Sequence, residues 1–173
     1  MNDSQFATAM DCEGYIGIYR AYNKRTDSYH FSARISLGMT DSIIPNELVK
    51  RFGSRIYVHI PRSGHKTSYS WVVQENEQVK KVLITLLPHL LVKREQAKNV
   101  LDFIEFRSGK CNRGRKRTIE EKVVLESYWL KAQELNQRAP ATTARENPVM
   151  GSYSLNPLET LGEKSEESSP LTV

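Results

Sequence analysis

The sequence contains little cysteine and no long apolar run. Among its 173 residues there are only two cysteines, Cys12 and Cys111, and neither has a neighbour at metal-ligand spacing. A disulfide scaffold is therefore excluded, and we expect two free thiols in a reducing compartment. The longest apolar stretch, residues 82–92, is interrupted by polar residues and a proline, so it does not predict a membrane span. We find no signal peptide and expect a soluble, intracellular protein of a chloroplast, a mitochondrion or a prokaryotic cytoplasm.

The charge is unevenly distributed along the chain. The 25 Lys and Arg residues against 20 Asp and Glu give a formal net charge of +5. Residues 139–173 hold two basic and five acidic side chains, a net of −3, which leaves +8 on residues 1–138. This excess favours a polyanionic partner, nucleic acid before a membrane surface. Four of the seven prolines also lie in 139–173, so we predict one domain, 1–138, followed by a disordered tail, 139–173.

Hydrophobic periodicity predicts two hairpins separated and followed by helices. In the clearest strand, 29–40, every second residue from Phe31 to Met39 is apolar. In strand 55–61 we expect Ile56, Val58 and Ile60 to face inward. The predicted helices are 2–12, 41–52, 75–87, 90–106 and 119–136, and the other predicted strands are 15–23 and 68–73. This order predicts an α+β fold, in which both hairpins form one antiparallel four-stranded sheet with helices on its apolar face.

The segment Phe6-Ala-Thr-Ala-Met-Asp-Cys-Glu-Gly14 ends the first helix. A hydrophobic residue, two small ones and two more hydrophobic ones precede an acid-small-acid-Gly sequence. The segment resembles the nonapeptide of the LAGLIDADG homing endonucleases, and the order of elements resembles their αββαββα fold over residues 2–137. Pro88–Ala97 is also similar to a segment of the dimeric members, with Lys93 at the position of a lysine near the active site. The resemblance implies a group I intron-encoded, single-motif endonuclease that serves intron homing.

Glu13 is the candidate metal ligand. An acid at the C-terminus of a helix faces the negative end of the helix dipole, which a cation would compensate. Mg²⁺ takes carboxylate, water and phosphate oxygens, and Mn²⁺ can substitute for it. Two such helix ends side by side could hold metals that neutralise a scissile phosphate and generate hydroxide. The alternative is a solvated carboxylate before a glycine turn.

The resemblance also implies roles for three further residues. Lys93 would stabilise charge on the phosphate or adjust the attacking water, with a plain surface lysine as the alternative. Asp41 would position that water, unless it only caps the helix that follows it. Asp11 would be structural, through hydrogen bonds to the beginning of the next strand.

A single copy of the motif requires two chains for an active site that cuts two strands. We therefore expect a homodimer with two-fold symmetry on a long pseudo-palindromic site. Residues four apart share a helix face, so Thr8 and Cys12 could meet their counterparts across the symmetry axis. Family members often have Gly at the position of Thr8. The predicted dimer interface consists of Ala7, Thr8, Asp11 and Cys12.

Outward positions of the strands and the basic loops are the candidates for DNA contact. Arg34 and Arg55 are the best candidates for guanine, because arginine binds its O6 and N7 with two donors. The strand candidates are Tyr15, Tyr19, Asn23, His30, Ser32, Arg34, Ser36, Arg55, Tyr57, His59, Ser68 and Ser70. The loop candidates, expected to bind phosphates, are Lys24, Arg25, Arg62, Lys66, Arg113, Arg115, Lys116 and Arg117.

These observations and the resemblance predict a metal-dependent, site-specific endonuclease that acts on double-stranded DNA. We expect no membrane partner and no small-molecule substrate. One alternative is a catalytically inactive repressor or RNA maturase of the same fold. Another is a basic α+β RNA-binding domain, but its usual Gly-Phe-aromatic pattern is missing.

Overall fold

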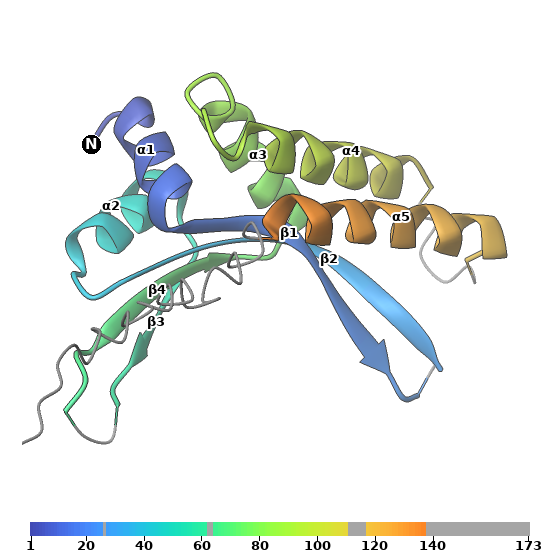
Figure 1. Ribbon diagram of the computed structural model, residues 1–173, viewed down its shortest axis with the longest axis horizontal. Helices are drawn as coiled ribbons and strands as arrows, with labels where there is room; N and C mark the ends of the chain where they lie inside the picture. Colours follow the sequence, from blue (N-terminus) through green and yellow to red (C-terminus); the bar gives the residue numbers. More distant parts are fainter. Residues whose placement is uncertain (26, 62–63, 111–116, 138–173) are drawn as a thin grey trace, which may run out of the picture. The chain divides into compact units, whose positions relative to one another are not determined.

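The computed structural model describes residues 1–25, 27–61, 64–110 and 117–137. Its elements, labelled in Figure 1, are α1 (Asp3–Glu13), β1 (Gly14–Asn23), β2 (Ser28–Met39), α2 (Ile43–Phe52), β3 (Arg55–His59), β4 (Ser68–Val73), α3 (Asn76–Leu86), α4 (Arg94–Lys110) and α5 (Ile119–Asn136). The predicted α+β class and αββαββα order are confirmed. The disordered tail predicted for 139–173 lies outside the described residues. No described helix has the length and apolar character needed to cross a membrane.

The four strands form one antiparallel sheet in the order β1-β2-β4-β3. Gly14 pairs with Leu37 at one end of the first hairpin, Leu37 pairs with Trp71 across the middle of the sheet, and Trp71 pairs with Ile56. The helices lie on one face of this sheet (Figure 1). The opposite face carries no described helix.

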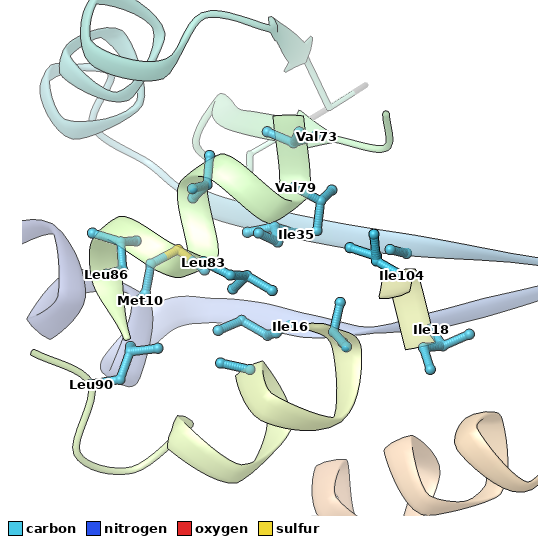
Figure 2. Close-up of a cluster of buried hydrophobic side chains, with 14 of the residues drawn as sticks. Met10, Ile16, Ile18, Ile35, Val73, Val79, Leu83, Leu86, Leu90 and Ile104 are labelled. Atoms are coloured by element: carbon cyan, nitrogen blue, oxygen red, sulfur yellow. The ribbon is translucent and has the colours of Figure 1, made fainter. Parts of the chain in front are cut away.

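The core fills the space between the sheet and the helices. Ile16 of β1 and Ile35 of β2 are fully buried, and Val79 and Leu83 of α3 pack over the same region (Figure 2). Side chains alternate between the two faces of a strand, so most apolar positions of β1, β2 and β4 point toward the helices and most polar ones point away. Burial of one face in this way holds the strands in register.

The prediction for the inner side of β3 is partly wrong. Ile56 is half-buried beside Trp71, but Val58 is 54% exposed and Ile60 is 75% exposed. β3 is the edge strand of the sheet, and the far end of its hairpin extends beyond the helices (Figure 1). The strand alternates as predicted, but no described helix covers its second half.

Local hydrogen bonds set both ends of α1, whereas a contact with α1 sets the start of α4. Asn2 and Gln5 form a reciprocal capping box at the start of α1, and the Gly14 N–H donates to the Met10 carbonyl at its end. By contrast, α4 begins at Arg94, four residues later than predicted. The backbone N–H groups of Leu91 and Lys93 are bound by a side chain of α1 instead.

Alanine substitution of one buried and one exposed isoleucine tests where the core lies. We expect Ile35→Ala to lower the free energy of unfolding by about 2–5 kcal/mol, because it leaves a cavity beneath α3. Ile119→Ala, at an exposed position of α5, should change it by about 0.5 kcal/mol or less. Urea denaturation followed by circular dichroism measures both at one protein concentration. Equal losses in the two variants would contradict this core.

Candidate functional site

Asp11, near the end of α1, is bound on both carboxylate oxygens. Its Oδ2 accepts a hydrogen bond from the Leu91 N–H and its Oδ1 accepts one from the Lys93 N–H, each at 2.8 Å. The carboxylate therefore caps the start of α4 from another helix. Its partner is the chain that precedes α4, not the beginning of β1, which corrects the prediction.

Lys93 in turn binds the end of α1 through its side chain. Its Nζ donates to the Met10 carbonyl at 2.8 Å and also to the Asp11 carbonyl. The Met10 carbonyl also accepts from the Gly14 N–H, whereas the Asp11 carbonyl is among those that the end of a helix leaves without an internal partner. A cation at this end of α1 also interacts favourably with the helix dipole. Burial lowers the pKa of Lys93, and the nearby charges of Asp11 and Glu13 oppose part of this effect. We call this pair of interactions, made by Asp11 and Lys93, the reciprocal clasp.

Glu13, the second acid at the end of α1, lacks the hydrogen bonds that Asp11 makes. It is the last residue of α1, it is exposed, and its carboxylate has no hydrogen-bond or ion-pair partner among the described residues. Gly14 follows it at a close approach, where an added Cβ would lie 2.5 Å from Met10 Cε. Glu13 therefore ends α1 at the surface, where its exposed carboxylate is available to a cation.

A divalent metal fits this environment only with additional ligands. Within the described part of one chain, no three His, Cys, Asp or Glu side chains come together as a metal site. One chain therefore offers the free carboxylate of Glu13, which is a suitable oxygen donor for a hard cation. Water, phosphate oxygens or a second chain would have to supply the rest.

Asp41 lies past the end of β2 that pairs with the start of β1. Leu37 is the partner of Gly14, so Asp41 follows that pair by four residues, at the end of the hairpin where Glu13 lies. Its Oδ1 accepts a hydrogen bond from the Ile43 N–H at 2.7 Å. The capping role is thus present, and the second carboxylate oxygen has no partner among the described residues.

All twelve strand candidates for DNA contact lie on one face of the sheet. The register pairs Tyr15 with Ser36, Tyr19 with Ser32, Tyr57 with Ser70 and His59 with Ser68. Residues directly opposite each other share a face, and this face is the one turned away from the helices. The same face also holds Gly17, Ala21, Gly38 and Val72, which the sequence did not single out because they carry no polar group.

Arg20 is basic but does not join that face. Its guanidinium lies 3.7 Å from the centre of the Trp129 ring and 4.5 Å from that of Tyr29, and it forms an ion pair with Glu126 at 3.1 Å. Arg20 therefore attaches β1 to α5 on the side of the helices.

The basic loop candidates are only partly described. Lys24, Arg25 and Lys66 are exposed at the ends of the hairpins, and Arg117 is half-buried. Arg117 lies close enough to His30 to affect it: partial burial lowers the pKa of His30, and the charges of Arg107 and Arg117 lower it further. The other candidates, Arg62, Arg113, Arg115 and Lys116, lie outside the described residues.

The exposed side of α1 differs from the predicted interface at one position. Thr8 and Cys12 are exposed, but Ala7 is 0% exposed and is part of the core of its own chain, so it has no surface to offer a partner. Two apolar residues that the sequence did not suggest, Leu91 at 82% and Val92 at 71% exposure, lie beside Asp11 instead. Both residues belong to the apolar stretch 82–92, in which Leu86 and Leu90 are buried, so only their exposure identifies them as a candidate surface.

Comparison with known proteins gives matches in structure only. No family model and no curated protein matches the sequence. The homing endonuclease I-CvuI, in complex with DNA, is 21% identical, with a TM-score of 0.52 over 76% of this chain and 94% of that chain. The archaeal intron-encoded homing endonuclease I-Vdi141I, also in complex with DNA, is 12% identical, with a TM-score of 0.63 over 79% and 84%. The LAGLIDADG homing endonuclease I-GzeII gives 12% identity and a TM-score of 0.61, over 86% of this chain but 50% of that chain.

The chain has the fold of the LAGLIDADG homing endonucleases. Its element order, its antiparallel sheet and its helices on one face agree with these structural neighbours over most of its length. The acid-small-acid-Gly segment falls at the junction of α1 and β1.

The two acids of α1 should respond oppositely to loss of charge. We expect Asp11→Asn to lower the free energy of unfolding by about 1–3 kcal/mol, because its amide group would face one of the two backbone N–H donors. Glu13→Gln should raise it by about 0.3–1 kcal/mol, because it removes a negative charge from a helix C-terminus. Urea denaturation without divalent metal measures both. An Asp11→Asn protein as stable as the parent would contradict the reciprocal clasp.

Proposed function

We propose that the protein is a site-specific, metal-dependent endonuclease for double-stranded DNA that acts as a homodimer of the single-motif LAGLIDADG type. The observation that carries this proposal is the free carboxylate of Glu13 at the end of α1, next to a polar, arginine-bearing sheet face. A structural acid would have a partner, as Asp11 has. The I-CvuI and I-Vdi141I structures hold DNA, which supports the same class of partner here.

Glu13 is proposed to hold Mg²⁺, or Mn²⁺ in its place. A bound divalent ion neutralises charge on the phosphate and activates water for attack on phosphorus. Lys93 uses two of its three N–H donors on the carbonyls of α1, so one remains to meet a phosphate oxygen. The free oxygen of Asp41 would accept a hydrogen bond from the attacking water. Loss of the phosphodiester bond leaves a phosphate and a hydroxyl on each cut strand.

The exposed side of α1 is proposed as the seam between two chains. Thr8 and Cys12 are small enough to let two helices approach closely, and Leu91 and Val92 would add apolar area beside them. A two-fold axis along this seam would bring the two copies of Glu13 together. The chain covers half of I-GzeII, so two copies would supply the length of that protein.

Cysteine cross-linking tests this seam. In a Cys111→Ser background, we expect a short bismaleimide to join two chains through Cys12, because that residue would lie near the two-fold axis. Cys12→Ser should abolish the cross-link. As a matched control, Ser127→Cys on the exposed side of α5, in the protein without Cys12, should give no dimer band. A parent protein that sediments as a monomer at micromolar concentration would contradict the dimer.

Binding selection followed by cleavage tests the activity. Random duplexes of about two helical turns are retained by the protein in Ca²⁺ and sequenced, and the selected duplex is then incubated with the protein in Mg²⁺. We expect a pseudo-palindromic consensus that is cut on both strands. Glu13→Gln should retain binding and reduce cleavage by about 100-fold or more, because several kcal/mol of metal-dependent stabilisation are lost.

Glu77→Gln, an exposed acid on α3, is the control and should cut as the parent does. Equal cleavage by the Glu13→Gln protein would exclude Glu13 as the metal ligand. Selective retention of DNA without cleavage by either protein would favour the non-catalytic alternative, a repressor or a maturase.

A further inference from the structure

One tyrosine on the outer face of the sheet lies over its own strand. An added Cβ at Gly17 would lie 2.5 Å from the Tyr15 hydroxyl oxygen and 2.7 Å from its Cζ. The phenol end of Tyr15 therefore occupies the place that a side chain at position 17 would take. Gly17 is buried as a result, and Tyr15 itself is half-buried. Tyr15 is thus turned along the sheet and does not project from it as a base-reading side chain would.

Asn136, the last residue of α5, lies beside the Tyr15 ring and Gly17. The side-chain Nδ2 of Asn136 donates to the Ile16 carbonyl at 3.0 Å and lies 3.2 Å from the Cβ position of Gly17. The space above Gly17 is therefore closed by Asn136 at the edge of β1 and filled by the phenol of Tyr15. We call Tyr15 and Gly17 together the tyrosine platform.

Arg34 is the direct neighbour of this platform on the next strand. It pairs with Gly17 in the register of β1 and β2, and the Cβ positions of such pairs are about 4.5–5.5 Å apart. Burial raises the pKa of Tyr15 and the charge of Arg34 opposes part of this rise, which agrees with their closeness. Arg34 is half-buried and has no ion-pair partner within the described ranges.

We propose that the tyrosine platform orients Arg34 to bind one guanine in each half of the DNA site. This inference rests on the proposed function, since it requires the sheet face to bind double-stranded DNA. The ring of Tyr15 fills the space over Gly17, so the arginine cannot fold into that space, and on this proposal its guanidinium would be directed toward the DNA. A pre-oriented planar guanidinium loses little freedom when its two donors meet O6 and N7 of guanine. Tyr15 is then a positioning residue, and Gly17 is required because no other residue leaves room for the ring.

The register of β1 and β2 also predicts how far this guanine lies from the phosphate that is cut. Gly17 lies three residues along β1 from Gly14, which is about 10 Å in a strand. Successive bases of one strand are about 3.4 Å apart. The position read by Arg34 should therefore lie about three base pairs from the phosphate that faces Glu13.

The experiment is a selection from random duplexes, in Ca²⁺, with the full chain and five variants. Arg34→Gln should abolish the guanine preference at one position of each half-site and so identify it. Tyr15→Ala and Gly17→Ala should each reduce the preference at that position about ten-fold, within the range of one two-donor arginine contact. Tyr15→Phe should restore it, because phenylalanine retains the ring over Gly17. Gly109→Ala, where an added Cβ meets nothing within 4 Å, is the matched glycine control and should select as the parent does.

The affinity for non-selected duplexes distinguishes a loss of Arg34 positioning from a general loss of DNA binding. Affinity for non-selected duplexes should stay within about two-fold in the Tyr15 and Gly17 variants, because neither changes the charge that binds phosphates. Thermal unfolding checks that Gly17→Ala remains folded, and Tyr15→Ala tests the same point without added volume. A guanine preference that survives in both Tyr15→Ala and Gly17→Ala but is lost in Arg34→Gln would overturn the platform and leave the proposed function intact. A parent chain that selects no sequence would overturn both.

Discussion

The placement of the candidate site depends on the reciprocal clasp between Asp11 and Lys93. Each side chain binds backbone groups of the other's segment, so the end of α1 and the start of α4 cannot move independently. Hydrogen bonds to charged groups contribute about 1.5–3 kcal/mol each, and four of them converge here. The same contacts delay the start of α4, which leaves Leu91 and Val92 in the exposed loop beside α1. The clasp thus places Glu13 and shapes the surface proposed for the second chain.

Helix geometry explains why two acids so close in sequence differ so much. Residues two positions apart on a helix point about 200° away from each other. When Asp11 turns toward α4, Glu13 must turn away from it. One carboxylate is therefore bound by backbone N–H groups while the other remains free at the negative end of the helix dipole, where a cation is favoured.

The sheet face is organised by the core on its other side. Burial of Ile16, Ile35 and their neighbours holds the strands in one register, because a slip of one residue would turn the apolar side chains outward. The polar side chains of the opposite face take their positions from this same register. The tyrosine platform beside Arg34 follows from it, since it requires Gly17 to lie directly opposite that residue.

The sequence by itself determined the element order, the antiparallel hairpins, the outward positions of the strands and the motif that ends at Gly14. These are local properties: alternation has a period of two residues, and a motif is contiguous. Only the tertiary structure decided that Asp11 binds residues about 80 positions away, that Ala7 is buried and Leu91 exposed, and that the second half of β3 is uncovered. Only it showed that Tyr15 lies over Gly17 and does not project from the sheet. Each of these depends on which distant segments pack together, and a local pattern contains no information about its partner.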